Sequence, residues 1–289
     1  IVSWTDEEEV FGISLNGSYS KRDSGTAGAD VAQWRAMAEE INALPCIKTI
    51  NETSASVEKL RSIKTVDEIN SICQAAKIAD QALANILPLV GAGITERELA
   101  TELDYQMAKL GSEELSFATI LLFGERSALP HGIPSDRALK TGDLILIDFG
   151  AVINGYRSDM TRTYIFGEAS TQQKQIYQLV QQAQQAAIDA ITVGVTGQQL
   201  YQQSANILLN SEYKDYAGEG LGHGVGLQLH EIPFLGPACN TRIEKGCVIT
   251  IEPGIYIPGW GGVRIEDDVV LTDNGLKTIT QASKELLVL

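Results

Sequence analysis

Residues 142–150 read GDLILIDFG, a stretch in which four consecutive aliphatic residues lead directly into the carboxylate of Asp148. A second stretch, GCVITIEPG at residues 246–254, repeats this pattern 104 residues later and has Glu252 at the matching position. Short apolar runs of this kind are typical of buried strands. Because an isolated ionised acid at the end of a buried strand is costly, we expect each carboxylate to be neutralised by a partner.

The repeat extends upstream into predicted helices. ITERELA at residues 94–100 matches VTGQQLY at residues 195–201. Residues 65–87 open with a T-x-x-E capping box and carry apolar residues at helical spacing, and residues 171–191 also place their apolar residues on one helical face. Each half is therefore predicted to run helix, helix, then a buried strand that ends in an acid. A pseudo-twofold axis between the halves would bring the two acids face to face.

A further acid follows each of these strands. Asp159 lies in NGYRSDMTRTY and Glu266 in GGVRIEDDVVL, and glycine-rich turns separate them from the preceding strands. Antiparallel pairing can bring Asp148 beside Asp159 and Glu252 beside Glu266. Four carboxylates in one pocket repel each other unless cations compensate, so we expect two divalent ions there. Oxygen-rich sites with one imidazole suit Mn²⁺ or Mg²⁺ and, less selectively, Co²⁺ or Zn²⁺.

Three histidines could supply the imidazole: His131 in SALPHGIP, and His223 and His230 in GLGHGVGLQLHEIP. A histidine among glycines and prolines is more often a structural residue than a ligand, and the pattern alone leaves both interpretations open. None of the three lies on a predicted helix face, which favours a functional role.

Composition excludes several classes of protein. The chain has 289 residues, 44% hydrophobic and 20% charged, which is typical of a globular protein with a sizeable core. A formal charge of −15 argues against a nucleic-acid partner. The sequence offers no apolar run long enough for a membrane span, so we expect no membrane partner and take the cytoplasm as the default location. Four cysteines without a C-x-x-C pair favour free thiols.

Four motifs together resemble the signatures of the pita-bread metallopeptidases: LIDFGAVINGYRSDMTRT, GLGHGVGLQLHEIP, TIEPGIY and GGVRIEDDVVLT. The similarity is greatest to the Xaa-Pro aminopeptidase and Xaa-Pro dipeptidase (prolidase) branch. It implies an α+β pita-bread fold whose pseudo-twofold halves form a curved, mostly antiparallel sheet covered by helices. Residues 64–289 would be the catalytic domain. Residues 1–63 resemble the end of a creatinase-type amino-terminal domain.

The resemblance also implies a dinuclear metal site. Two divalent ions, with Mn²⁺ expected first and Co²⁺ or Zn²⁺ as alternatives, would be bound by Asp148, Asp159, His223, Glu252 and Glu266. The expected bridging ligands are Asp159 and Glu266.

Further residues match the family's catalytic and supporting positions. His131 and His230 correspond to histidines that contact substrate and transition state, and Thr163 and Arg264 lie close enough to ligands to orient carboxylates by hydrogen bonds. The implied reaction is hydrolysis of the bond before proline by a hydroxide that bridges the two ions. Glu252 would move the proton of the attacking water, and His230 would donate to the developing oxyanion.

Several alternatives stay open at this point. The methionine aminopeptidase branch shares HGIP, although EPGIY and VRIEDD favour the proline-specific branch. The creatine amidinohydrolase branch lacks the metal ligands, and a non-catalytic peptide-binding or scaffold protein of the same fold is a further alternative. Many prolidase-like relatives have a histidine four residues before the ligand His223, where this chain has Glu219. The expected partners are a peptide with proline second and further copies of this chain in a homo-oligomer, a dimer or higher.

Overall fold

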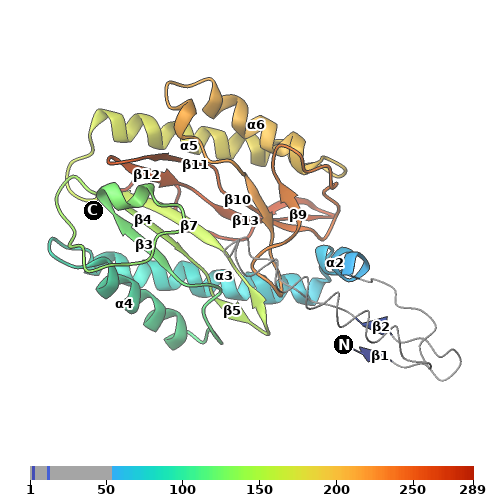
Figure 1. The fold of residues 1–289 in the computed structure, drawn as a ribbon. Helices are drawn as coiled ribbons and strands as arrows, with labels where there is room; N and C mark the ends of the chain where they lie inside the picture. The colour runs from blue at the N-terminus through green and yellow to red at the C-terminus, as the bar shows by residue number, and fades with distance from the viewer. Residues whose placement is uncertain (1, 4–11, 14–53) are drawn as a thin grey trace, which may run out of the picture. The chain divides into compact units, whose positions relative to one another are not determined.

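The protein is described by a computed structural model that covers residues 2–3, 12–13 and 54–289 (Figure 1). The chain divides into two compact units, Ile1–Leu60 and Arg61–Leu289. The larger unit carries every candidate site residue.

In the smaller unit, strands β1 (Val2–Ser3) and β2 (Gly12–Ile13) pair antiparallel. Helix α2 (Ser54–Ser62) includes the boundary between the two units. The amphipathic helix suggested by VAQWRAMAEEINAL, residues 31–44, lies outside the described residues. The interpretation of residues 1–63 as part of an amino-terminal domain stays a prediction.

The long helices begin where the sequence predicts. Their bounds are α3 (Val66–Ile86), α4 (Glu96–Lys109), α5 (Thr171–Asp189) and α6 (Gly197–Leu209). Each begins with a capping box, in which the N-cap hydroxyl accepts from the N3 amide and the N3 side chain accepts from the N-cap amide. The pairs are Thr65 with Glu68, Thr95 with Glu98, Ser170 with Gln173 and Thr196 with Gln199. Short 3₁₀ helices are η1 (Leu87–Leu89), η2 (Gly124–Ala128) and η3 (Lys214–Tyr216).

The first half contains a three-stranded antiparallel sheet in the order β3-β4-β7. Its strands are β3 (Ile120–Phe123), β4 (Leu144–Phe149) and β7 (Met160–Ile165). A small hairpin of β5 (Val152–Ile153) and β6 (Tyr156–Arg157) is inserted between β4 and β7.

The second half contains a five-stranded antiparallel sheet in the order β14-β13-β10-β8-β9. Its strands are β8 (Gly222–Gly224), β9 (Glu231–Leu235), β10 (Val248–Ile251), β13 (Asp267–Thr272) and β14 (Gly275–Thr278). A hairpin of β11 (Gly254–Ile257) and β12 (Gly261–Arg264) separates β10 from β13. The β10–β13 pair with its inserted hairpin therefore repeats the β4–β7 pair, as the sequence repeat predicts.

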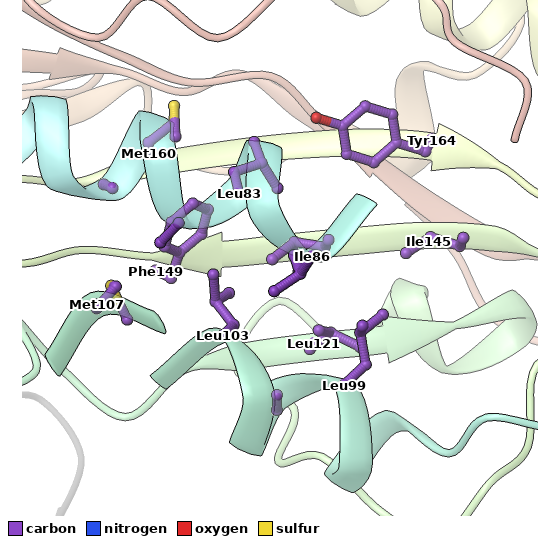
Figure 2. Packing of buried hydrophobic residues seen from close by; sticks show 14 of the residues in the cluster. Leu83, Ile86, Leu99, Leu103, Met107, Leu121, Ile145, Phe149, Met160 and Tyr164 are labelled. Carbon is purple, nitrogen blue, oxygen red and sulfur yellow. The ribbon is translucent and has the colours of Figure 1, made fainter. Parts of the chain in front are cut away.

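Helices cover the sheets from two sides. In Figure 1, α3 and α4 lie on one side of the strands and α5 and α6 on the other. Figure 2 shows the core on the α3–α4 side, where the labelled residues include Leu83, Ile86, Leu99, Leu103, Leu121, Ile145 and Phe149. A second cluster joins α5 and α6 to β10 and β13. Within the described residues, no helix combines the length and hydrophobicity that a bilayer span needs.

The arrangement of β4 explains why an acid lies near the end of a buried strand. One set of its side chains packs in the core with α3 and α4: Ile145, Ile147 and Phe149. The alternate residues Leu144 and Leu146 instead pack with side chains of the second half, among them Tyr256. Because successive strand residues point to opposite faces, Asp148 projects to the same side as Leu146, toward the second half. The strand period thus aims Asp148 between the two halves.

Candidate metal centre

Three candidate ligands form a tight buried cluster between the halves. One ligand atom from each of Asp159, His223 and Glu266 lies within 4.8 Å of the others. His223 Nε2 is 3.7 Å from Asp159 Oδ2 and 3.2 Å from Glu252 Oε1. Asp148 is also close enough for its charge to raise the pKa of both Asp159 and Glu266. The structure therefore brings all five predicted ligands into one electrostatic environment.

The strand registers place the two pairs of acids differently: one pair is directly opposite and the other is diagonal. In the β10–β13 ladder, Ile251 pairs with Asp267, and continuing the register by one residue sets Glu252 opposite Glu266. In the β4–β7 ladder, Asp148 pairs with Thr161, so Asp159 lies two residues before that partner and directly ahead of the first residue of β7.

Asp159 and Asp148 are thus diagonal neighbours on one face of the pair of strands. The β4–β7 ladder ends at the pair of Phe149 with Met160, one residue short of Asp159. The Asp159 amide leaves the ladder and donates to Asp268 Oδ2 at 2.9 Å.

Three of the four acids in the cluster, Asp148, Asp159 and Glu266, are buried. Burial raises the pKa of Asp159 and of Glu266 well above the ordinary carboxyl value, and neighbouring carboxylates raise both further. Burial also raises the pKa of Asp148, although the charge of Arg264 opposes this shift. Without a bound cation, the raised pKa values favour protonation of some of these acids in the folded protein.

His223 and Glu252 differ from the other ligands. Burial is the largest single effect and acts against charge on both side chains, but their mutual hydrogen bond and attraction, together with further partners, outweigh it. The pKa of His223 is therefore raised and the pKa of Glu252 is lowered. Thr250 Oγ1 donates to Glu252 Oε1 at 3.0 Å and accepts from the His223 amide at 3.0 Å. The Glu252 side chain is 25% exposed and the Asp159 side chain 6%, so Glu252 is the more accessible of the two carboxylates.

Orphaned oxygens support a cation at this place. Asp148 Oδ1 and Glu266 Oε1 are buried and accept no hydrogen bond. Buried polar atoms normally have a hydrogen-bond partner. A carboxylate oxygen that accepts no hydrogen bond can instead bind a metal ion. The donor set of four carboxylates and one imidazole fits divalent ions such as Mn²⁺.

Arg264 and Thr161 donate hydrogen bonds to two of the candidate ligands, Asp148 and Glu266. Arg264 Nη2 donates to Asp148 Oδ2 at 2.5 Å, and its Nη1 donates to the Tyr256 hydroxyl at 2.7 Å. Thr161 Oγ1 donates to Glu266 Oε2 at 2.6 Å. The sequence predicts that Thr163 orients a carboxylate by a hydrogen bond. In the structure its hydroxyl instead donates to the backbone carbonyl of Arg264 at 2.8 Å. Thr163 therefore acts on the site only through the arginine.

Sequence reasoning missed Thr161, Thr250 and Asp268. A signal for the two threonines was present, since each stands two residues from an acid and side chains two apart on a strand share a face. Asp268 is fully buried, and burial raises its pKa to about 8. Its role as acceptor for the Asp159 amide depends on contact across 109 residues of sequence.

The two remaining histidines are close enough to the cluster to interact with its ligands. The His230 ring lies with its centroid 4.3 Å from that of His223, at an interplanar angle of 68°. The charge of His131 acts on Asp148. Both His131 and His230 are exposed, and so is Glu219, which lies in the segment between η3 and β8. Exposed histidines beside a buried acidic cluster can meet a ligand that enters from solvent.

A buried set of carboxylates with one imidazole, held between two similar halves of an α+β fold, is the type of centre found in metal-dependent hydrolases. The chain belongs to metallopeptidase family M24, whose model matches residues 70–273. The resemblance drawn from the sequence motifs is therefore confirmed.

Individual relatives agree with this assignment. The chain is 41% identical over 287 residues to a Xaa-Pro dipeptidase of Pyrococcus furiosus, a match that covers 99% of this chain and 80% of that protein. It resembles the solved structure of a Xaa-Pro dipeptidase from Bacillus anthracis, with 41% identity, a TM-score of 0.84 and coverage of 90% of this chain and 73% of the other. It also resembles an X-Pro aminopeptidase from Thermotoga maritima, with 36% identity, a TM-score of 0.83 and coverage of 88% and 72%. The predicted pita-bread fold is confirmed.

Proposed function

We propose that this chain is a metal-dependent exopeptidase that hydrolyses the bond between an amino-terminal residue and a following proline. The observation that carries the proposal is the buried set of acids around His223, with unsatisfied oxygens on Asp148 and Glu266. The names of the relatives support the substrate class, since they include both Xaa-Pro dipeptidases and an X-Pro aminopeptidase. The homo-oligomer and the cytoplasmic location stay predictions.

The proposed ligands would hold two divalent ions, which together balance four negative charges. Mn²⁺ is our first choice and Co²⁺ or Zn²⁺ the alternatives, because hard oxygen ligands dominate a site with one imidazole. When bound, such ions supply a hydroxide nucleophile from water at neutral pH and polarise the scissile carbonyl. Asp159 and Glu266 are the proposed shared ligands.

The chain's own residues handle the proton and the charge that develops on oxygen. Glu252 is ionised, because its pKa is lowered, and it is partly open to solvent, so its carboxylate can accept the proton of an attacking water and pass it to the leaving nitrogen. His230 is exposed beside the cluster and would donate to the oxyanion. His131 would contact the substrate from the side of Asp148.

Selection of proline must rely on shape, because the proline nitrogen carries no N–H that the enzyme could recognise with an acceptor. A pocket that fits the ring would orient the tertiary amide for attack. We therefore expect a large difference in kcat/KM between peptides with proline and with alanine in the second position.

The test is hydrolysis by metal-stripped protein to which Mn²⁺, Co²⁺ or Zn²⁺ is returned. Met-Pro and Met-Pro-Ala are the substrates, and Met-Ala and Met-Ala-Ala are the matched controls. Hydrolysis of only the proline peptides, dependent on metal and on a free amino terminus, supports the proposal, and the ratio of the two proline peptides separates dipeptidase from aminopeptidase. Preference for Met-Ala-Ala would instead favour methionine aminopeptidase activity. Binding of peptide without hydrolysis in any metal would favour a non-catalytic protein.

A further inference from the structure

Glu231 directly follows His230 and is itself nearly inaccessible, although its charge has no part in the chemistry described above. We infer that Glu231 is a positioning residue that fixes His230 for the reaction through a buried ion pair with Lys64. The inference rests on the proposed function, which assigns His230 to the oxyanion.

The Glu231 carboxylate is held from three directions. Its Oε1 accepts from Arg61 Nη2 at 2.5 Å and from the Gln228 amide at 2.9 Å. Its Oε2 accepts from Lys64 Nζ at 3.0 Å. The side chains of Lys64 and Glu231 are 1% and 4% exposed, so this pair has almost no contact with solvent.

These contacts close the loop that carries His230. Strands β8 and β9 pair Gly224 with Glu231, and the residues between them form a tight turn in which the Gly226 amide donates to the Gln228 carbonyl at 3.1 Å. A Cβ atom at Gly226 would lie 2.8 Å from Glu231 Oε2. The carboxylate therefore packs against the inside of the turn and bonds to its backbone, which leaves the turn little freedom.

Lys64 links this loop to a second part of the site. Its amide donates to the Gly246 carbonyl at 2.9 Å, in the turn that leads into β10. Strand β10 ends immediately before Glu252. One buried lysine is thus bonded both to the loop that carries His230 and to the turn before the strand that leads to Glu252.

Stability alone does not account for such a pair. Burying two charges carries a desolvation cost that their attraction offsets only in part, and well-packed apolar residues often serve as well or better. What an ion pair does provide is a preference for one arrangement of its surroundings. Here that arrangement sets the His230 ring 4.3 Å from the His223 ring. Loss of the pair should therefore change the orientation of the His230 side chain more than it changes the positions of the metal ligands.

The experiment is a double-mutant cycle between Glu231 and His230. The variants are Glu231→Gln, His230→Ala and their combination, and the readouts are kcat, KM and bound metal per chain. We expect Glu231→Gln to lower kcat by about 10²-fold, the scale for a misplaced catalytic group, with KM and metal content nearly unchanged. In the His230→Ala background, Glu231→Gln should cause no further loss of kcat.

A second variant guards against a folding defect. The combination Arg61→Met, Lys64→Met and Glu231→Leu removes all three charges of the cluster and nearly keeps the volume, so the thermal midpoint should be retained while kcat falls as in Glu231→Gln. Asp273→Asn is the control, because it removes an exposed ion pair with Lys245 and should leave kcat unchanged.

The outcomes separate the inference from the proposed function. Effects of Glu231→Gln and His230→Ala that multiply, or loss of metal in Glu231→Gln, would overturn the inference and leave the role of His230 intact. Wild-type kcat in His230→Ala would remove the role of His230 from the proposed function, and the inference with it.

Discussion

The hydroxyl of Thr161 donates to Glu266 at an oxygen separation of 2.6 Å, and Arg264 Nε donates to the same hydroxyl at 2.9 Å. Because the arginine supplies its own proton, the threonine proton must point to the carboxylate. This fixes Glu266 Oε2 as the hydrogen-bonded oxygen and leaves Oε1 as the unsatisfied one. A single hydroxyl thus orients a proposed metal ligand.

We predict that Thr161→Val weakens metal binding by about 10- to 100-fold, the usual effect of losing a hydrogen bond to a ligand. Thr163→Val is the matched control, since it removes a buried hydroxyl on the same strand that contacts backbone and no carboxylate. Competition with a metal-binding dye measures both affinities. Equal losses in the two variants would contradict the specific role of Thr161.

A second prediction separates the two neighbouring histidines. His223→Ala should weaken the binding of metal, because His223 lies in the cluster with Asp159 and Glu266. His230→Ala should retain the metal and lose about 10²- to 10³-fold in kcat, the scale for removal of an oxyanion donor. Metal analysis and kinetics on the same preparations decide the assignment, and the reverse pattern would exchange the two roles.

Local elements could be predicted from the sequence to within a few residues. Capping boxes fixed the starts of α3 and α4, and the repeat in GDLILIDFG and GCVITIEPG predicted the strands β4 and β10 with an acid at the same place. These signals are short in range, because each depends on residues within one turn of helix or one strand.

Contacts between distant segments could not be predicted in this way. The pairing of Lys64 with Glu231 joins residues separated by 167 positions, and that of Thr161 with Glu266 by 105. Such pairs follow from the docking of whole elements, about which hydrophobic periodicity says nothing.

Removal of metal should destabilise the protein. Without cations, the four acids lose their counter-charge and several must be protonated on folding. An ion present at 100 times its dissociation constant stabilises by about 2.7 kcal/mol for each independent site. Thermal unfolding with and without chelator, at constant pH, measures the difference. An unchanged midpoint would argue against tight binding at this centre.

The metal-free protein should also show an unusual dependence on pH. In the folded chain, burial raises the pKa of Asp159 and Glu266 well above their ordinary values and that of Asp268 to about 8. The folded state then holds protons that the unfolded state has already released, so the contribution of these three acids to stability is fully present below their unfolded pKa values and is lost as the pH rises toward about 8. Denaturant titrations of the stripped protein across this range test the slope, and Asp268→Asn should reduce it. A stability that rises with pH would contradict the assignment.

The acid at position 219 gives a prediction about peptide length. Glu219 is exposed and lies four residues before His223. If this side chain contacts the residue after the scissile bond, Glu219→His should change the ratio of Met-Pro to Met-Pro-Ala cleavage without changing metal content. An unchanged ratio would mean that the side chain at position 219 does not contact the residue after the scissile bond.

The division of the ligands between the halves has a consequence for the order of folding. Asp159 follows strands that can pair locally, whereas His223 and Glu266 come from segments 64 and 107 residues later in the chain. Contacts of such long range form after local ones, because a long loop must first be closed. Neither half alone carries the whole ligand set, so during refolding the uptake of metal should lag behind the formation of helix. The time course of metal uptake would then report on the last stage of assembly, in which the two halves dock.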